Sequence, residues 1–139
     1  MSGPRRSGTK FGPAAALFEF ALHSDARGEL CSIEFRSLPF APQRMFFVQP
    51  AHAGDRRGGH AHKTAHQLLI CAAGKIDIDI VHAGLAETFH LHSPGKAIYI
   101  APRVWSEQMY LSADARLLVL ASEPYSFASY SYNPVDQAP

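Results

Sequence analysis

The 139-residue chain contains only two cysteines, Cys31 and Cys71, and neither belongs to a Cys-x-x-Cys motif. This number excludes a disulfide framework of the kind that stabilises small secreted domains. Both residues lie among apolar neighbours, and free cysteine is one of the most buried residue types. We therefore expect both thiols to pack in the core as small apolar side chains.

Net charge is almost absent, because 13 basic and 12 acidic residues give +1 at pH 7. This balance gives no global attraction to nucleic acid or to a membrane surface, so any electrostatic role must be local. No segment approaches the run of about 18 apolar residues that spans a membrane. The N-terminus has basic residues but lacks the apolar segment and cleavage site of a secretory signal. We expect a cytoplasmic protein without a nucleic-acid or membrane partner.

The composition is that of a globular protein, with 47% hydrophobic and 18% charged residues. Residues 1–13 are rich in Gly, Pro, Arg and Ser and are predicted to form a flexible tail, which leaves residues 14–139 as one domain. Short strand-like runs separated by Gly/Pro turns, without convincing helical periodicity, predict an all-β sandwich or barrel. The predicted strands cover residues 16–23, 30–35, 44–49, 65–72, 75–81, 86–91, 96–100, 107–111 and 116–121.

Two of these runs also predict their surroundings. Residues 76–80 alternate isoleucine with aspartate, which is typical of an antiparallel strand with one buried and one exposed face. Residues 116–121 are apolar on both faces after the first position, which predicts a central strand.

The most informative feature is the pair His60 and His62, which enters a strand-like run. Strand side chains alternate with period 2, so the two imidazoles must project from the same face. If that face lines a barrel interior, they share a cavity, which Arg57 and Lys63 make attractive to an anion. From the residues alone, such a pair can either bind a metal ion or transfer protons.

The spacing around this pair resembles the first motif of the cupins, which are small jelly-roll barrels. The motif begins Gly54-x5-His60-x-His62, but Gln67 stands where a glutamate is usual, and Glu107 stands where the second motif has a histidine. Glutamine is a poor ligand for most divalent ions, whereas two histidines and a carboxylate can hold Fe(II). The chain thus resembles a single-domain cupin with an RmlC-like jelly roll and an altered ligand set. A metal-dependent enzyme using His60, His62 and Glu107 is one function open to it.

A longer resemblance is carried by residues 56–70, RRGGHAHKTAHQLLI, which are similar to the Arg-Gly-x-His-Ala-His-Lys-x-x-x-Gln motif of the nucleotide-sugar 3,4-ketoisomerases. The likeness extends from about residue 17 to residue 130. It includes Arg-Gly-x-Leu at 27–30, Pro-Phe at 39–40 with Arg44, Ser-Pro at 93–94, Tyr-Ile at 99–100 and Trp-x-Glu at 105–107. The resemblance implies a homodimeric isomerase of thymidine diphosphate (dTDP) sugars that needs no metal and no cofactor.

The reaction that the resemblance implies moves a carbonyl from C4 to C3 of dTDP-4-keto-6-deoxyglucose through an enediol. A base must remove the C3 proton, which is acidic because it is α to the ketone, and C4 must then be protonated. Histidine, with an ordinary pKa of about 6.5, suits both steps near neutrality. By the resemblance, His62 is the expected carbon base and His60 its partner in moving hydroxyl protons. The residues expected to bind substrate are Arg57, Lys63, Arg44, Arg27, Glu107, Tyr99 and Gln67.

The chain departs from the family pattern where a tyrosine pair is usual and Phe46 and Phe47 stand instead. Phenylalanine keeps the packing but removes a hydrogen-bond donor and an acid. This departure leaves a non-catalytic sugar-nucleotide-binding cupin as a further function. His66, four residues after His62, is expected on the same strand face, whereas the second His-x-His pair, at 90–92, is expected to face solvent.

Aromatic side chains also gather near the C-terminus, at positions 125, 127, 130 and 132. Rings of this kind suit a dimer contact, stacking against a nucleotide base or packing against the domain. The sequence leaves these three roles open.

Overall fold

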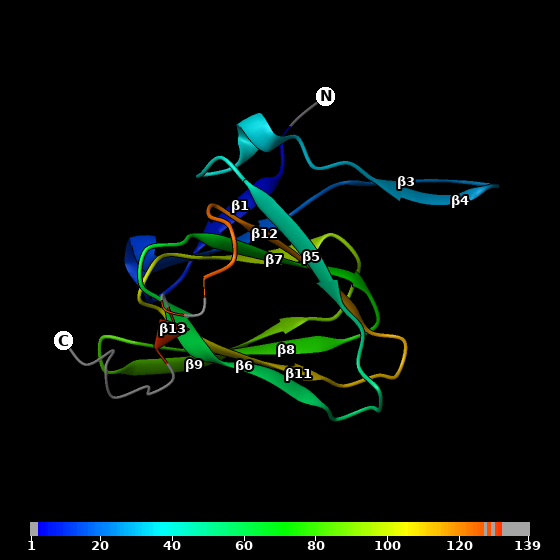
Figure 1. Ribbon diagram of the computed structural model, residues 1–139. Coiled ribbons are helices and arrows are strands. Elements are labelled where there is room, and N and C mark those ends of the chain that lie inside the picture. The colour runs from blue at the N-terminus through cyan, green and yellow to red at the C-terminus, as the bar shows by residue number, and fades with distance from the viewer. Residues whose placement is uncertain (1–2, 127, 129, 132–139) are drawn as a thin grey trace.

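Two layers of β-sheet make up most of the structure (Figure 1), a computed structural model that describes residues 3–126, 128 and 130–131. The strands are β1 (Arg5–Gly8), β2 (Ala15–Glu19), β3 (Leu22–Asp25), β4 (Gly28–Cys31), β5 (Arg44–Val48), β6 (Arg56–His62), β7 (Gln67–Ala73), β8 (Ile76–His82), β9 (Leu85–Leu91), β10 (Lys96–Ile100), β11 (Trp105–Tyr110), β12 (Arg116–Ala121) and β13 (Tyr130–Ser131). Two 3-10 turns, η1 (Gly12–Ala14) and η2 (Phe35–Ser37), interrupt them. Within the described part of the chain, no helix is long and apolar enough to cross a membrane.

The larger sheet has six strands in the order β1-β2-β10-β7-β12-β5, and the smaller has five in the order β13-β6-β11-β8-β9. Paired strands are antiparallel, and many neighbours, such as β2 and β10, are far apart in the sequence. The strands β3 and β4 form a hairpin that projects from the body of the molecule (Figure 1). Two antiparallel sheets joined by such long connections form a jelly roll. The all-β prediction is confirmed.

The core between the sheets follows from the alternation visible in the sequence. Ile76, Ile78 and Ile80 point into the sandwich and are fully buried, while Asp77 and Asp79 point outward. Burying one such isoleucine stabilises the fold by about 1.5–3 kcal/mol relative to leaving it exposed. The prediction of a strand with one buried face is therefore confirmed for β8.

A second apolar cluster covers the outer face of the six-stranded sheet. Leu68, Ile70 and Leu120 belong to it, and the segment 33–40 packs over it with apolar side chains. The neighbouring positions Leu69 and Val119 point the other way, into the space between the sheets. Strands β7 and β12 are thus buried on both faces, which confirms the central position predicted for residues 116–121.

The N-terminal segment differs from its prediction. Residues 5–8 form β1, which pairs with β2 in the register Arg5↔Glu19, and η1 follows it. The expected flexible tail is therefore wrong for this segment. Free backbone groups at the edge of β2 accept a further strand, although Arg, Ser and Gly have no strong strand preference of their own.

The two cysteines lie in different surroundings. Cys71 in β7 is buried, as predicted, but Cys31 in β4 is exposed. The prediction for Cys31 is wrong because β4 lies in the projecting hairpin, whose strands are exposed along most of their length. The run predicted as one strand at 30–35 ends at Cys31 and continues into η2.

Candidate active site

A cavity of about 490 Å³ lies between the two sheets, where β5 at the edge of the larger sheet approaches β6 and β13 at the edge of the smaller one. Its volume is typical of a small-molecule site. Apolar side chains of β5, β7 and β12 form one wall, and polar side chains of β6 and β11 form the other. The lining residues are Phe46, Phe47, Val48, Gln49, Arg57, Gly58, His60, His62, Gln67, Leu69, Gln108, Leu117, Val119 and Tyr130.

Strand β6 brings the two predicted histidines into this cavity. His60 and His62 line the same wall, their ring centroids are 5.0 Å apart, and the rings meet edge to face. His62 is buried, with 8% of its surface exposed, and His60 is half-buried. The prediction that the two imidazoles share one face and one cavity is confirmed.

A bulge at Gly58 and Gly59 adds Arg57 to the same wall. Arg57 and His60 are three positions apart in the sequence, so a regular strand would place them on opposite faces. Here the consecutive residues Ser106 and Glu107 of β11 pair with His60 and Gly58 of β6, so β6 has one extra residue, Gly59, at this point. The φ angles are 90° at Gly58 and 76° at Gly59, which favour glycine.

Close packing reinforces the need for glycine at this bulge. A Cβ atom on Gly58 would lie 2.9 Å from Nε2 of Gln108 and 3.1 Å from the Ser106 carbonyl oxygen. The Gly-Gly sequence before the histidines is therefore what lets Arg57 and the histidine pair face one ligand. This signal was present in the sequence, because isolated glycines within a strand often mark a bulge.

The electrostatics of the pair favour the neutral form of both rings. Burial, the neighbouring His60 and the positive charge of Arg44 together lower the pKa of His62 to about 4. Burial also lowers the pKa of His60, although a hydrogen bond to the Gly58 backbone opposes this shift. Both imidazoles are thus unprotonated at neutral pH and able to accept a proton. Nε2 of His62 is buried and has no hydrogen-bond partner among the described residues, so this nitrogen is not held in a competing hydrogen bond.

Tyr130 is part of this site, although the sequence predicts no specific role for it. Its ring stacks on His60 with centroids 4.3 Å apart and meets His62 edge-on at 4.5 Å. The backbone explains the contact, because β13 pairs with β6 in the register Tyr130↔His62. Of the other aromatic residues near the C-terminus, Tyr125 has its ring centroid 5.9 Å from that of Tyr130. Positions 127 and 132 fall outside the described residues.

Two more of the predicted substrate-binding residues lie at or beside the cavity. Gln67, at the start of β7, is buried and lines it. The guanidinium of Arg44 lies over the rings of Phe46 and Tyr125, with its Cζ atom 4.9 and 5.5 Å from the two ring centroids. Arg44 is close enough to His62 to lower its pKa. Together with Arg57, these residues give the site positive charge and amide hydrogen-bonding groups.

Glu107 does not reach the cavity. It is paired in register with Asp79 on the outward face of the five-stranded sheet, and its carboxylate accepts a hydrogen bond from Nη1 of Arg56 at 2.8 Å. The neighbouring Gln108 faces inward in its place. The carboxylate therefore does not join His60 and His62, and the three-ligand set of the metal-dependent alternative is not assembled.

Tyr99 and His66 lie on the outer side of the six-stranded sheet. Tyr99 belongs to the outer apolar cluster, and its hydroxyl lies 2.6 Å from Nδ1 of His66. The expectation that His66 shares a strand face with His62 is wrong, because β6 ends at His62 and β7 begins at Gln67 in the other sheet. The chain crosses between sheets in the four residues that sequence alternation treated as one strand.

The last two predicted binding residues are exposed and outside the cavity. Lys63 follows the end of β6, in the crossing to the other sheet. Arg27 lies at the turn of the projecting β3–β4 hairpin, where its Nη2 donates to Asp25 Oδ2 at 2.6 Å. In this chain, the structure brings together Arg57, His60, His62 and Gln67, with Arg44 beside them, and not Lys63, Arg27, Glu107 or Tyr99.

Fold and site together define a class. An antiparallel jelly roll carries a pair of neutral histidines in a cavity with a cationic rim, which is the arrangement of a cupin suited to proton transfer on an anionic ligand. The model of the family described as "FdtA: WxcM-like, C-terminal" matches residues 14–137, and the chain belongs to this family. The predicted relationship is confirmed.

Known relatives agree with this assignment. The chain is 33% identical over 107 residues to TDP-4-oxo-6-deoxy-alpha-D-glucose-3,4-oxoisomerase of Aneurinibacillus thermoaerophilus, covering 76% of this chain and 77% of the relative. It is similar to QdtA, a sugar 3,4-ketoisomerase of Thermoanaerobacterium thermosaccharolyticum solved with TDP, with a TM-score of 0.83, 33% identity and coverage of 91% and 95%. The WlaRB TDP-quinovose 3,4-ketoisomerase of Campylobacter jejuni gives a TM-score of 0.79, 32% identity and coverage of 87% and 94%.

Proposed function

We propose that this protein is a sugar-nucleotide 3,4-ketoisomerase that converts dTDP-4-keto-6-deoxyglucose to a dTDP-3-keto-6-deoxyhexose. The observation that carries the proposal is the buried, neutral pair His60 and His62 in a ligand-sized cavity. Relatives that are 32–33% identical are named as enzymes of this reaction type. One solved structure of QdtA, in a histidine-to-asparagine variant, holds TDP-4-keto-6-deoxyglucose.

The chemistry assigns a role to each imidazole. His62 removes the proton from C3 of the substrate, and the electrons of the C–H bond move into an enediolate whose charge rests on O4. The proton then returns to C4, while the O3 hydroxyl proton passes to O4 through His60, so that the product is an isomer with the carbonyl at C3. The unpaired Nε2 of His62 and the lowered pKa values suit a base that starts unprotonated. The positive charges of Arg57 and Arg44 stabilise the enediolate, so the step needs no metal ion.

The same cations bind the substrate before reaction. Arg57 lines the cavity beside the histidines, and its planar guanidinium matches a diphosphate in a bidentate manner. Gln67 offers amide groups to the sugar hydroxyls from the buried end of the cavity. The apolar wall of Phe46 and Leu69 excludes water, which strengthens these polar contacts.

Because the tyrosines usual in the family are missing here, we assign a positioning role to Tyr130. Phe46 and Phe47 line the cavity without hydroxyl groups. The ring of Tyr130 instead holds both imidazoles in place by stacking on one and meeting the edge of the other. Tyr130 thus restricts the rotation of the rings that exchange protons with the substrate.

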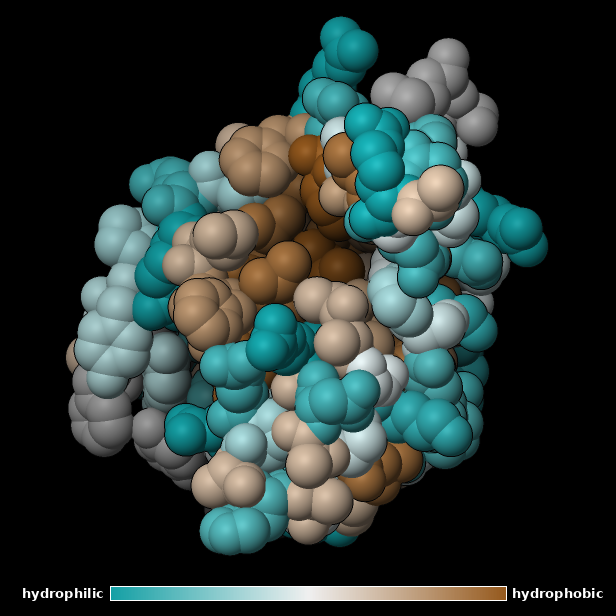
Figure 2. Space-filling model, turned by 90° about the vertical axis from the view of Figure 1, so that its right-hand side faces the viewer, coloured by the Kyte–Doolittle hydropathy of each residue, from teal (hydrophilic) through white to brown (hydrophobic). Residues whose placement is uncertain are grey.

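A homodimer is the second part of the proposal. Figure 2 shows apolar surface gathered in a hollow on the side from which the β3–β4 hairpin projects. Large apolar side chains are exposed in the hairpin region at Leu30 and Phe35 and on the edge strand β5 at Met45 and Phe47. Exposed apolar surface and an unprotected edge strand favour association of two copies. Sedimentation velocity should show a dimer for the wild type and a monomer for Met45→Glu, and a monomeric wild type contradicts the proposal.

We also assign the enzyme to the cytoplasm and to the supply of deoxysugars for polysaccharides or glycosylated products. The exposed free thiol of Cys31 is consistent with a reducing compartment. A 3-keto-6-deoxyhexose linked to a nucleotide is a precursor that a reductase or aminotransferase can use. Expression of the protein with a fluorescent tag in its native host tests the location, and an extracytoplasmic signal contradicts it.

The experiment that tests the function separates an enzyme from a binding protein. The absence of hydroxyl groups at Phe46 and Phe47 favours the binding protein as the second candidate, because a proton-transferring group is lost there. The purified protein is incubated with dTDP-4-keto-6-deoxyglucose, and the product is followed by NMR, while calorimetry measures the affinity for dTDP. Formation of the 3-keto sugar supports the proposal. Binding of dTDP without any isomerised product leaves only the binding protein.

A further inference from the structure

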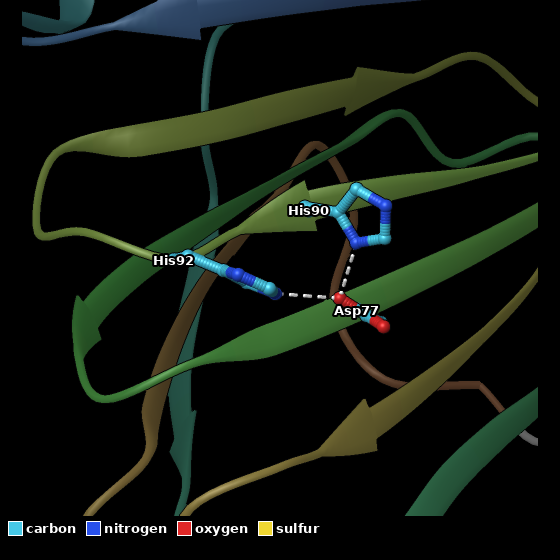
Figure 3. Close-up of side chains that lie close together, drawn as sticks. All are labelled: Asp77, His90 and His92. Atoms are coloured by element: carbon cyan, nitrogen blue, oxygen red, sulfur yellow. Dashed lines mark hydrogen bonds and ion pairs between the residues drawn. The ribbon is translucent and has the colours of Figure 1, made fainter.

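The second His-x-His pair lies on the outer face of the five-stranded sheet, next to a carboxylate. His90 in β9 is the direct cross-strand partner of Asp77 in β8, and His92 follows one residue after β9 ends. The inner faces of these strands bury Ile76 and Leu91, so the three polar side chains point outward together (Figure 3). The expectation that the pair faces solvent is confirmed, because both histidines are exposed, and both rings share Asp77 as a partner.

The ring nitrogens converge on one carboxylate oxygen. Nδ1 of His90 and Nε2 of His92 each lie 2.7 Å from Oδ1 of Asp77, and the three groups offer ligand atoms within 4.8 Å of one another. Neighbouring ligands of an ion with bonds of about 2.0–2.1 Å stand roughly 3 Å apart. A small opening of these two contacts therefore leaves room for an ion bound to all three side chains. Among the described residues, this is the one grouping of three metal-ligating side chains.

We propose that Asp77, His90 and His92 form a binding site for a divalent transition-metal ion of the zinc type, separate from the cavity. Two imidazoles and one carboxylate suit Zn²⁺ and its neighbours, whereas Mg²⁺ and Ca²⁺ prefer oxygen ligands. The strands are already paired, so binding requires little reordering of the backbone. Within the described part of the chain, Asp77 forms no ion pair with lysine or arginine that would compete with the metal.

The position of the site indicates what the ion does. In the order β13-β6-β11-β8-β9, the strands β8 and β9 lie at the opposite edge of the sheet from β6 and β13, which carry the histidines of the cavity. An ion at Asp77 therefore does not touch the substrate. It links β8 to the edge strand β9 and to the residue that follows it, and so stabilises this edge of the sandwich.

Titration with Zn²⁺ tests the proposal directly. The untagged protein, freed of metal with a chelator, is titrated with Zn²⁺ in a calorimeter, and one ion per chain is expected. The affinity should fall by at least about tenfold in His90→Gln and again in His92→Gln. It should be unchanged in His52→Gln, because His52 is an exposed histidine in the loop before β6, and β6 lies two strands away from β8 in the sheet. The proposal is overturned if the two ligand variants bind Zn²⁺ as tightly as the wild type, or if the wild type shows no saturable binding.

Two further measurements distinguish this site from the cavity. Zn²⁺ should raise the midpoint of thermal unfolding in the wild type and not in His90→Gln, since a ligand that binds only the native state stabilises it. The double variant His60→Asn with His62→Asn should bind the ion as the wild type does. If this double variant alone loses Zn²⁺ binding, the ion belongs to the cavity and the proposal is wrong. Binding of Mg²⁺ with equal affinity likewise contradicts the assigned ligand chemistry.

Discussion

Replacing His62 with asparagine should change how the stability of the protein depends on pH. The ring of His62 is buried next to His60 and Arg44, and its pKa in the folded state is about 4, against 6.5 for an ordinary histidine. Between these two values the unfolded chain binds a proton that the folded chain does not. The contribution of His62 is therefore fully present above pH 6.5 and is lost as the pH falls toward 4.

The size of the effect follows from the shift. A pKa lowered from 6.5 to about 4 corresponds to about 3 kcal/mol, and at pH 4.5 most of this, about 2–3 kcal/mol, is expressed. Urea unfolding of the wild type and of His62→Asn is compared at pH 7.5 and at pH 4.5. Because groups remote from His62 titrate equally in both proteins, the difference between the two free energies of unfolding reports His62 together with its coupling to His60.

The wild type should lose about 2–3 kcal/mol more than His62→Asn between the two pH values. His60→Asn should give a change of the same sign, because burial also lowers the pKa of His60. An equal loss of stability in the wild type and in His62→Asn would refute the conclusion that His62 is held in its neutral form.

Three further outcomes are expected. Gly58→Ala should lower the free energy of unfolding by about 1–3 kcal/mol in urea, since φ is 90° and the new Cβ meets the Gln108 amide, and unchanged stability would contradict the bulge argument. Tyr130→Leu should lower kcat about tenfold, while the kcat of Tyr130→Phe stays near that of the wild type, because the ring and not the hydroxyl restrains the imidazoles. Equal rates for the two variants would contradict the positioning role of the Tyr130 ring. Ile78→Ala should cost about 2–5 kcal/mol in the same urea experiment, as expected for a cavity in a fully buried core, and a cost below 1 kcal/mol would contradict the packing described.

Alternation of side chains explains why much of the fold was predictable. It identified β8 from its isoleucines, the central strand β12 from its two apolar faces, and the shared face of His60 and His62. It failed where the chain changes sheet, since alternation assumes a continuous strand. The four residues between His62 and Gln67 move His66 to the other side of the larger sheet, and no local pattern marks that crossing.

The membership of the site was harder to predict than its centre. Arg57 enters the cavity only because of the bulge at Gly58, and Tyr130 enters it through a strand pairing with His62 that spans 68 positions of the chain. Glu107 and Gln108 are both polar, so the sequence alone does not tell which of them faces inward; the pairing of Glu107 with Asp79 decides it. Arg27 lies on a projecting hairpin whose direction is set by packing that sequence patterns do not record.

Deuterium exchange tests the central claim, proton transfer by His62, most directly. In deuterated water the wild type, incubated with dTDP-4-keto-6-deoxyglucose, should incorporate deuterium at C3 and C4 of the sugar, as NMR detects. His62→Asn should incorporate none while binding dTDP with nearly unchanged affinity, because Arg57 and Gln67 remain in place. Exchange at the wild-type rate in His62→Asn would contradict the assignment of His62 as the carbon base.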